Sequence, residues 1–168
     1  TTDITVNPTT TSSYTVTATT DGCSGATTQT VTVNPLPTPT ITAAPSFTIC
    51  NGSNTTLTAS GGTTYVWNPG GETTVSITVN PTTNSSYTVT ATTDGCSGAT
   101  IQTVTVNPLP TPTITAAPSL TICSGSNTTL TASGGTTYVW NTTETTASIT
   151  VTPPVGTTTY NVTGTTAG

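Results

Sequence analysis

Four cysteines have the widest chemical range of any residues in this sequence. Cys23, Cys50, Cys96 and Cys123 follow one another in steps of 27, 46 and 27 residues. Zinc sites usually combine cysteines a few positions apart with one another or with histidine, and this chain has neither C-x-x-C nor His. A catalytic thiol needs a neighbouring His or Lys, and both residue types are absent. We therefore expect no metal site, no thiol catalysis, and disulfides formed in an oxidising compartment.

The remaining charged side chains offer little for catalysis. All five are carboxylates, and the formal net charge is −5 because Lys, Arg and His are absent: Asp3, Asp21, Glu72, Asp94 and Glu144. The chain thus has no base for a nucleophile, no Schiff-base lysine and no cation for phosphates. Two carboxylates can cleave a glycosidic bond, but four of these five stand in predicted turns. We predict a protein that is not an enzyme, takes no cofactor and binds no nucleic acid.

The sequence repeats itself at an interval of 73 residues. Cys23 recurs as Cys96, Cys50 recurs as Cys123, and the segment NPLPTPTITAAPS at 34–46 returns unchanged at 107–119. Two length changes interrupt the register, at 67–74 against 140–146 and at 81–87 against 153–160. Both fall in stretches rich in Gly, Pro, Thr and Asn, and loops tolerate such changes whereas paired strands do not.

The composition predicts an all-β protein. Thr, Val and Ile number 56, 14 and 8, and these β-branched residues suit a pleated sheet. Apolar and polar residues alternate in short runs separated by turn residues, as in half-buried strands. The strands expected in one repeat are 40–42 and 47–50 (split at Pro45), 55–60, 64–68, 75–79, 87–92 and 101–106. Seven short strands with a central tryptophan predict an immunoglobulin-like β-sandwich.

The prolines at alternate positions in 35–39 and 108–112 predict extended linkers between repeats. Taken as boundaries, they divide the chain into three parts. Residues 1–35 are the C-terminal part of an Ig-like repeat, 36–108 form a complete repeat, and 109–168 form a repeat that lacks its last strand. The next copy of Cys96 is expected at position 169.

Aromatic residues are the predicted core markers. The bulky side chains of a small all-β unit are needed for core volume, and those concerned are Trp67, Trp140, Tyr14, Tyr87 and Tyr160. The alternative is a sugar-stacking platform of Tyr65 with Trp67, repeated as Tyr138 with Trp140. Because each pair shares one face of its strand, burial of the tryptophan would also bury the tyrosine.

The pairing of the cysteines stays open between two schemes. Cys50 with Cys96 would close a loop inside one repeat and stabilise it by about 3–4 kcal/mol. In a standard sandwich, however, these positions lie at opposite ends of strands and are separated by roughly 23 Å, whereas a disulfide needs Cα atoms within about 7 Å. Cys50 would then face the next repeat or a neighbouring chain. Under either scheme Cys23 and Cys123 take partners outside these 168 residues or in a neighbouring chain.

Several motifs together resemble a known family. The frame TIC-x-G-S-N-T-T-L-T-A-S-G-G is followed by Y-V-W, S-Y-T-V-T, D-G-C-S-G and V-T-V-N-P. This frame is similar to the Ig-like and PKD-like tandem repeats of large surface adhesins secreted by gliding and other Bacteroidota. The resemblance covers the whole chain and implies an extracellular, rod-forming stalk.

We therefore expect a structural segment of an extracellular or cell-surface bacterial adhesin, acting as a mechanical spacer or filament. The expected partners are further copies in a fibre, with surface glycans as a second partner. Polymerisation by donation of residues 23–33 to the third repeat of another copy, with Cys23 joined to Cys123, is one version of this expectation. A carbohydrate-binding or spacer module of a secreted glycan-degrading enzyme is the alternative. No run of 18 apolar residues exists, so no membrane span is expected.

Overall fold

The computed structural model describes residues 3–166, and the chain is all-β over this range. Its strands fall into several two- to four-stranded sheets. Compactness divides the chain into two units. The first takes residues 1–45, 56–79 and 86–103, and the second takes residues 46–55, 80–85 and 104–168.

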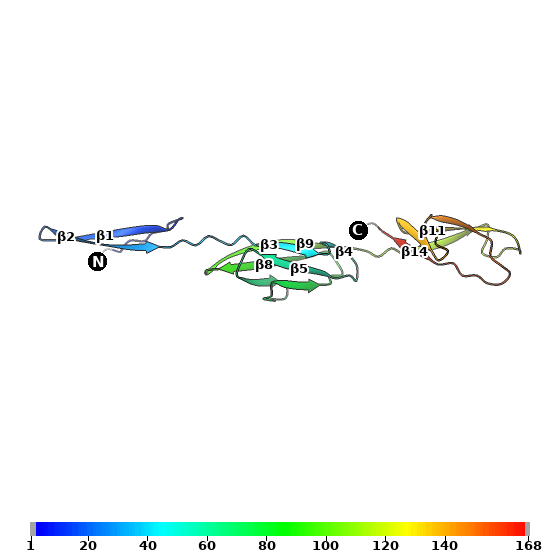
Figure 1. Cartoon of the computed structure of the whole chain (residues 1–168), viewed down its shortest axis with the longest axis horizontal. Helices are drawn as coiled ribbons and strands as arrows, with labels where there is room; N and C mark the ends of the chain where they lie inside the picture. Colours follow the sequence, from blue (N-terminus) through cyan, green and yellow to red (C-terminus); the bar gives the residue numbers. More distant parts are fainter. Residues whose placement is uncertain (1–2, 167–168) are drawn as a thin grey trace. The chain divides into compact units, whose positions relative to one another are not determined.

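The first unit begins with a hairpin of two long strands (Figure 1, blue). Strand β1 (Ser12–Thr20) pairs antiparallel with β2 (Cys23–Val31), from Ser12 opposite Val31 to Thr20 opposite Cys23. Asp21 and Gly22 form the turn with φ of 51° and 80°. A two-residue hairpin turn needs positive φ at both positions, which is why Asp-Gly stands there. Every residue of β2 is exposed.

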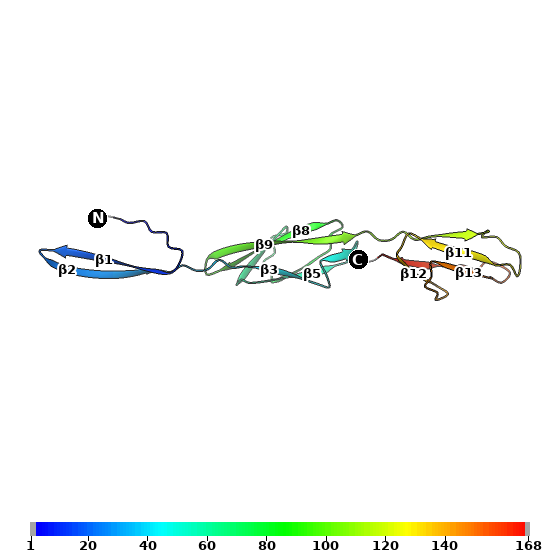
Figure 2. The same ribbon diagram turned by 90° about the horizontal axis from the view of Figure 1, so that it is seen from above.

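Two sheets follow in residues 40–107. Strands β3 (Thr40–Ala44), β5 (Thr55–Ser60) and β7 (Ser76–Val79) form a three-stranded sheet in the order β3-β5-β7. Strands β6 (Thr64–Asn68), β8 (Ser85–Thr93) and β9 (Cys96–Asn107) belong to a four-stranded sheet with β4 (Thr48–Cys50), in the order β4-β9-β8-β6 (Figure 2). Pro45 has no N–H to donate, and it separates β3 in one sheet from β4 in the other.

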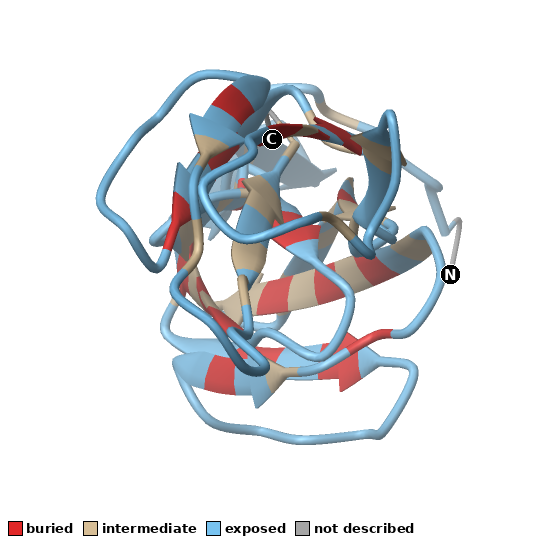
Figure 3. Ribbon diagram, turned by 90° about the vertical axis from the view of Figure 1, so that its right-hand side faces the viewer, coloured by how far each residue is buried: buried red, intermediate tan, exposed pale blue. Residues whose placement is uncertain are grey.

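The core of the first unit comes from alternate positions of these strands. Buried residues alternate with exposed ones along the ribbon (Figure 3), as expected when one face of a sheet packs and the other is wet. The buried apolar side chains of this unit are Leu57, Ala59, Tyr65, Trp67, Ile77, Tyr87, Val89 and Ala91.

The second unit contains the strands β10 (Thr113–Ala117), β11 (Thr128–Ser133), β12 (Thr137–Trp140), β13 (Ser148–Val151) and β14 (Val162–Thr165). They form a three-stranded sheet, β10-β11-β13, and a two-stranded sheet, β12-β14. The core cluster consists of Leu130, Ala132, Tyr138, Trp140 and Ile149. Strand β4 and residues 104–107 of β9 also lie in this unit.

The strands appear where the alternation predicts them, and several are longer than predicted. Strand β9 begins at Cys96 instead of residue 101, and β8 spans 85–93 instead of 87–92. Segments 32–39 and 108–112, expected as linkers, contain no strand. The two length changes of the repeat fall between strands, because β6 ends at Asn68, β7 spans Ser76–Val79 and β8 begins at Ser85.

Candidate functional site

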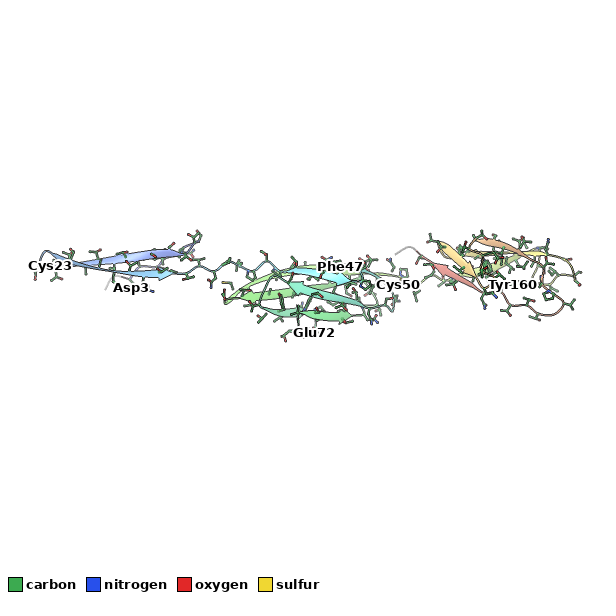
Figure 4. The ribbon with its side chains drawn as sticks, viewed as in Figure 1. Asp3, Cys23, Phe47, Cys50, Glu72 and Tyr160 are labelled. Carbon is green, nitrogen blue, oxygen red and sulfur yellow. The ribbon has the colours of Figure 1, made fainter. Side chains whose placement is uncertain are left out.

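The four cysteines lie at strand ends. All are free thiols in the structure, with Cys23, Cys50 and Cys123 exposed and Cys96 half-buried. Figure 4 labels Cys23 beside the hairpin turn and Cys50 at the end of β4. A disulfide between Cys50 and Cys96 is therefore not part of this structure.

The register of β4 on β9 explains why this expected disulfide is wrong. The two strands run parallel, and Cys50 is the partner of Asn107 at the last position of β9. Cys96 is the first residue of the same strand. Eleven steps along a strand cover about 36 Å, whereas a disulfide needs Cα atoms within about 7 Å. The objection drawn from a standard sandwich is the scheme that this geometry fits.

Cys96 lies instead beside the segment that enters residues 40–107. Its thiol donates a long hydrogen bond of 3.8 Å to the carbonyl oxygen of Asn34. The Asn34 side-chain amide in turn donates to the carbonyl oxygen of Asp94 at 3.2 Å. The Asp94–Gly95 turn, which has φ of 50° and 78°, is thus held against the preceding linker.

The aromatic side chains that could stack on a sugar are used internally. Trp67 is fully buried and donates from Nε1 to the carbonyl oxygen of Thr74 at 2.9 Å. Tyr65 is buried too, and its hydroxyl donates to the carbonyl oxygen of Gly62 at 2.7 Å. The equivalent bonds recur in the second unit, from Trp140 to Thr146 and from Tyr138 to Gly135. A sugar cannot reach these ring faces.

The tyrosines at the start of the penultimate strand differ from one copy to the next. Tyr87 is buried, and this burial raises the pKa of its hydroxyl. Tyr14 and Tyr160, its repeat equivalents, are half-buried. Their different exposure reflects how complete the packing is around each copy.

The carboxylates lie apart on the surface. Asp21 and Asp94 stand in the two Asp-Gly turns, and Asp3 and Glu72 are exposed (Figure 4). Hydrogen bonds from the Thr142 hydroxyl and from its own backbone lower the pKa of Glu144. Within residues 3–166, no three His, Cys, Asp or Glu side chains come close enough to hold a metal ion.

Side-chain hydroxyls make an arrangement that residue-by-residue reading of the sequence misses. Neighbouring strands are joined by hydroxyl pairs on their outer faces, such as Thr58 with Ser76 at 2.9 Å and Thr15 with Thr28 at 2.7 Å. The same pattern recurs at Ser86 with Thr103 and at Thr131 with Ser148. The signal was the Thr at every second position, but only the register shows which hydroxyls meet.

The second unit contains a cavity of about 410 Å³. It lies between the segment that follows β10 and the segment that precedes β14, and its lining includes Leu120, Ile122, Cys123, Leu130, Val155 and Tyr160. No charged side chain lines it, so the cavity suits an apolar or hydrogen-bonding occupant.

Comparison with known proteins adds no family. No protein-family model matches the chain, and no curated protein was found to match it. Among the described residues, no helix has the length and apolar character needed to cross a membrane.

Proposed function

We propose that this chain is a force-bearing segment of an extracellular bacterial adhesin stalk or filament, built from tandem Ig-like repeats of 73 residues. Two features support the Ig-like assignment. The sheets β3-β5-β7 and β4-β9-β8-β6 have the strand orders of such a sandwich, and Trp67 is buried on the strand that corresponds to its third strand. The repeats of large Bacteroidota surface adhesins, which the sequence resembles, are the proposed relatives.

The observation that carries the proposal is the parallel pairing of β4 with the end of β9. Thr105 donates its N–H to the carbonyl oxygen of Phe47 at 2.8 Å, and Asn51 donates to Asn107 at 2.9 Å. Strand β4 is reached from the linker at 32–39, and β9 leads into the linker at 108–112. Tension on the two linkers pulls these parallel strands in opposite directions along their length. Such shear loads all the hydrogen bonds between them together instead of one by one.

The surface chemistry supports the same role. Hydroxyl pairs join the outer faces of neighbouring strands, and the chain has no cation that could form a salt bridge with its five carboxylates. Cross-strand hydroxyl pairs contribute roughly 0.2–1 kcal/mol each. Neutral hydrogen bonds are little affected by salt, which suits a segment exposed to a variable medium. No catalytic role is proposed for any residue.

Single-molecule force spectroscopy tests this function. The whole chain is pulled from its ends, and the unfolding force of residues 36–108 is compared with that of Thr105→Pro. Proline removes the N–H that bonds to Phe47, so the variant should unfold at a lower force with only a modest loss of equilibrium stability.

Thr32→Pro is the matched control. Thr32 is the repeat equivalent of Thr105, but it follows the hairpin and is not part of a strand. This variant should leave the unfolding force unchanged. If both variants matched the parent chain, the parallel pair would carry no load, and the mechanical role would have to be abandoned.

A further inference from the structure

Strand β14 has one unpaired edge. It pairs with β12 only, from Val162 opposite Trp140 to Thr165 opposite Thr137. Its repeat equivalent, β8, lies between β6 and β9. Within the described part of the chain, no strand occupies the place beside β14 that β9 occupies beside β8. The edge therefore presents free backbone groups that can pair with an added strand.

The cavity of the second unit lies next to this edge and exposes side chains that are covered in the earlier copy. Ile122 is half-buried, whereas its equivalent, Ile49, is only 5% exposed. Leu120 is 82% exposed, whereas its equivalent, Phe47, is half-buried. The segment 121–123 forms no strand, although its equivalent is β4. What differs is the cover that β9 supplies.

The sequence of β2 matches the inner face of β9. The six less exposed positions of β9 alternate along the strand, and their equivalents in and just after β2 are the same residue type each time. These are Cys96, Gly98, Thr100, Gln102, Val104 and Val106 in β9, and Cys23, Gly25, Thr27, Gln29, Val31 and Val33 in the earlier copy. The strands differ at an outward position, where Ile101 replaces Thr28.

Strand β2 is poorly used where it stands. It pairs with β1 alone, and a two-stranded hairpin without a core is marginally stable in water. Val31 is 36% exposed, whereas Val104 is fully buried. Transfer of β2 from β1 to β14 would keep one antiparallel partner and would bury Val31 as Val104 is buried.

We propose that the groove beside β14 binds strand β2 of a second copy of this chain. The incoming strand pairs antiparallel with β14 and parallel with residues 121–123, as β9 does with β8 and β4. Each copy carries both a donor strand and an acceptor groove, so the contact is head-to-tail and propagates into a filament. This inference goes beyond the proposed mechanical role and does not depend on it.

The register corrects the expected disulfide between copies. Because Cys50 is the ladder partner of Asn107, Cys123 should lie beside Asn34 of the donated strand. Cys23 would then stand eleven positions away, at the far end. The pairing of Cys23 with Cys123 is therefore excluded from the proposed complex, and a thiol introduced at position 34 becomes its reporter.

The experiment cross-links copies of the whole 168-residue chain. Cys23→Ser, Cys50→Ser and Cys96→Ser leave Cys123 as the sole native thiol, and Asn34→Cys adds the reporter. Mild oxidation should produce a ladder of disulfide-linked dimers and larger species that collapses on reduction, with the 34–123 linkage identified by mass spectrometry. The matched control places the thiol at the other end of β2, as Ser24→Cys, and should give roughly ten-fold less linkage to Cys123.

A second measurement does not rely on thiols. Val31→Asp should prevent assembly, as followed by sedimentation velocity, because a carboxylate would enter the core; Thr28→Asp adds the same charge on the outward face and should assemble normally. Val31 is exposed in the hairpin, so its replacement leaves the acceptor unit folded. The proposal is overturned if the parent chain stays monomeric, if both aspartate variants behave alike, or if the 34–123 linkage forms within single chains.

Discussion

Gly98, near the start of β9, lies directly against the carbonyl oxygen of Pro37 in the preceding linker, and a Cβ at this position would overlap that oxygen. Gly25, the repeat equivalent, has no neighbouring atom within 4 Å of a Cβ placed on it. Gly98→Ala should therefore destabilise residues 36–108 by about 1–3 kcal/mol, as overpacking usually does.

Gly25→Ala is the matched control and should leave stability unchanged. Denaturant unfolding followed by tryptophan fluorescence measures both variants. Equal stabilities would mean that the linker is not held against β9, contrary to the contact between Pro37 and Gly98.

The partnership of Cys50 with Asn107 makes a second prediction. Parallel neighbours have Cα atoms at a distance compatible with a disulfide. Asn107→Cys should oxidise readily to a bond with Cys50 inside one chain and stabilise residues 36–108 by up to about 4 kcal/mol. Non-reducing peptide mapping and unfolding with and without reductant check this outcome.

Asn107→Ser serves as the control, because it removes the amide without adding a thiol. A bond between Cys50 and Cys96 in the oxidised parent chain would show that the register of β4 on β9 is wrong.

Burial of Trp67 makes a third prediction. Trp67→Ala should cost about 3–5 kcal/mol, because it leaves a cavity and removes the donor to the Thr74 carbonyl oxygen. Val66 is the adjacent residue on the opposite face and is 50% exposed, so Val66→Ala should cost well under about 1 kcal/mol. Equilibrium denaturation measures the two variants, and similar losses would place Trp67 outside the core.

The raised pKa of Tyr87 predicts a loss of stability at high pH. Burial disfavours the phenolate, so the folded-state pKa lies above the ordinary value of 10.0. The contribution is fully present below that value and is lost as the pH rises through the higher folded-state pKa. Unfolding midpoints measured on both sides of pH 10 should fall in the parent chain. The fall should be smaller in Tyr87→Phe, and identical pH profiles would show that the Tyr87 hydroxyl is not its cause.

The hydroxyl pair of Thr58 with Ser76 provides the fifth prediction. A double-mutant cycle with Thr58→Ala and Ser76→Ala should give a coupling of roughly 0.2–1 kcal/mol, because the two hydroxyls bond at 2.9 Å. The control cycle combines Ser76→Ala with Thr103→Ala, whose hydroxyl bonds to Ser86 instead. That cycle should be additive within about 0.3–0.5 kcal/mol. Equal coupling in both cycles would deny the cross-strand bond any specific contribution.

Much of the fold could be predicted from particular residues. The alternation of Leu57 and Ala59 with threonine predicted β5 at its observed bounds, and the turn at Asp94–Gly95 followed from the need for positive φ. Pro45 predicted the break between β3 and β4. The cysteine pairing could not be derived, because each candidate partner lies in a different strand and strand order is not encoded locally.

The sequence by itself determined which residues form strands, where the chain turns, and that Trp67 and Tyr65 share one face. These properties follow from local sterics and from the two-residue period of a strand, which act between near neighbours in the chain. Only the tertiary structure decided that β4 joins β9 in parallel, that Cys50 therefore lies a strand's length from Cys96, and that β14 keeps a free edge. The physical reason is that alternation specifies which face of a strand is buried, whereas its neighbour is chosen by packing between residues far apart in the chain.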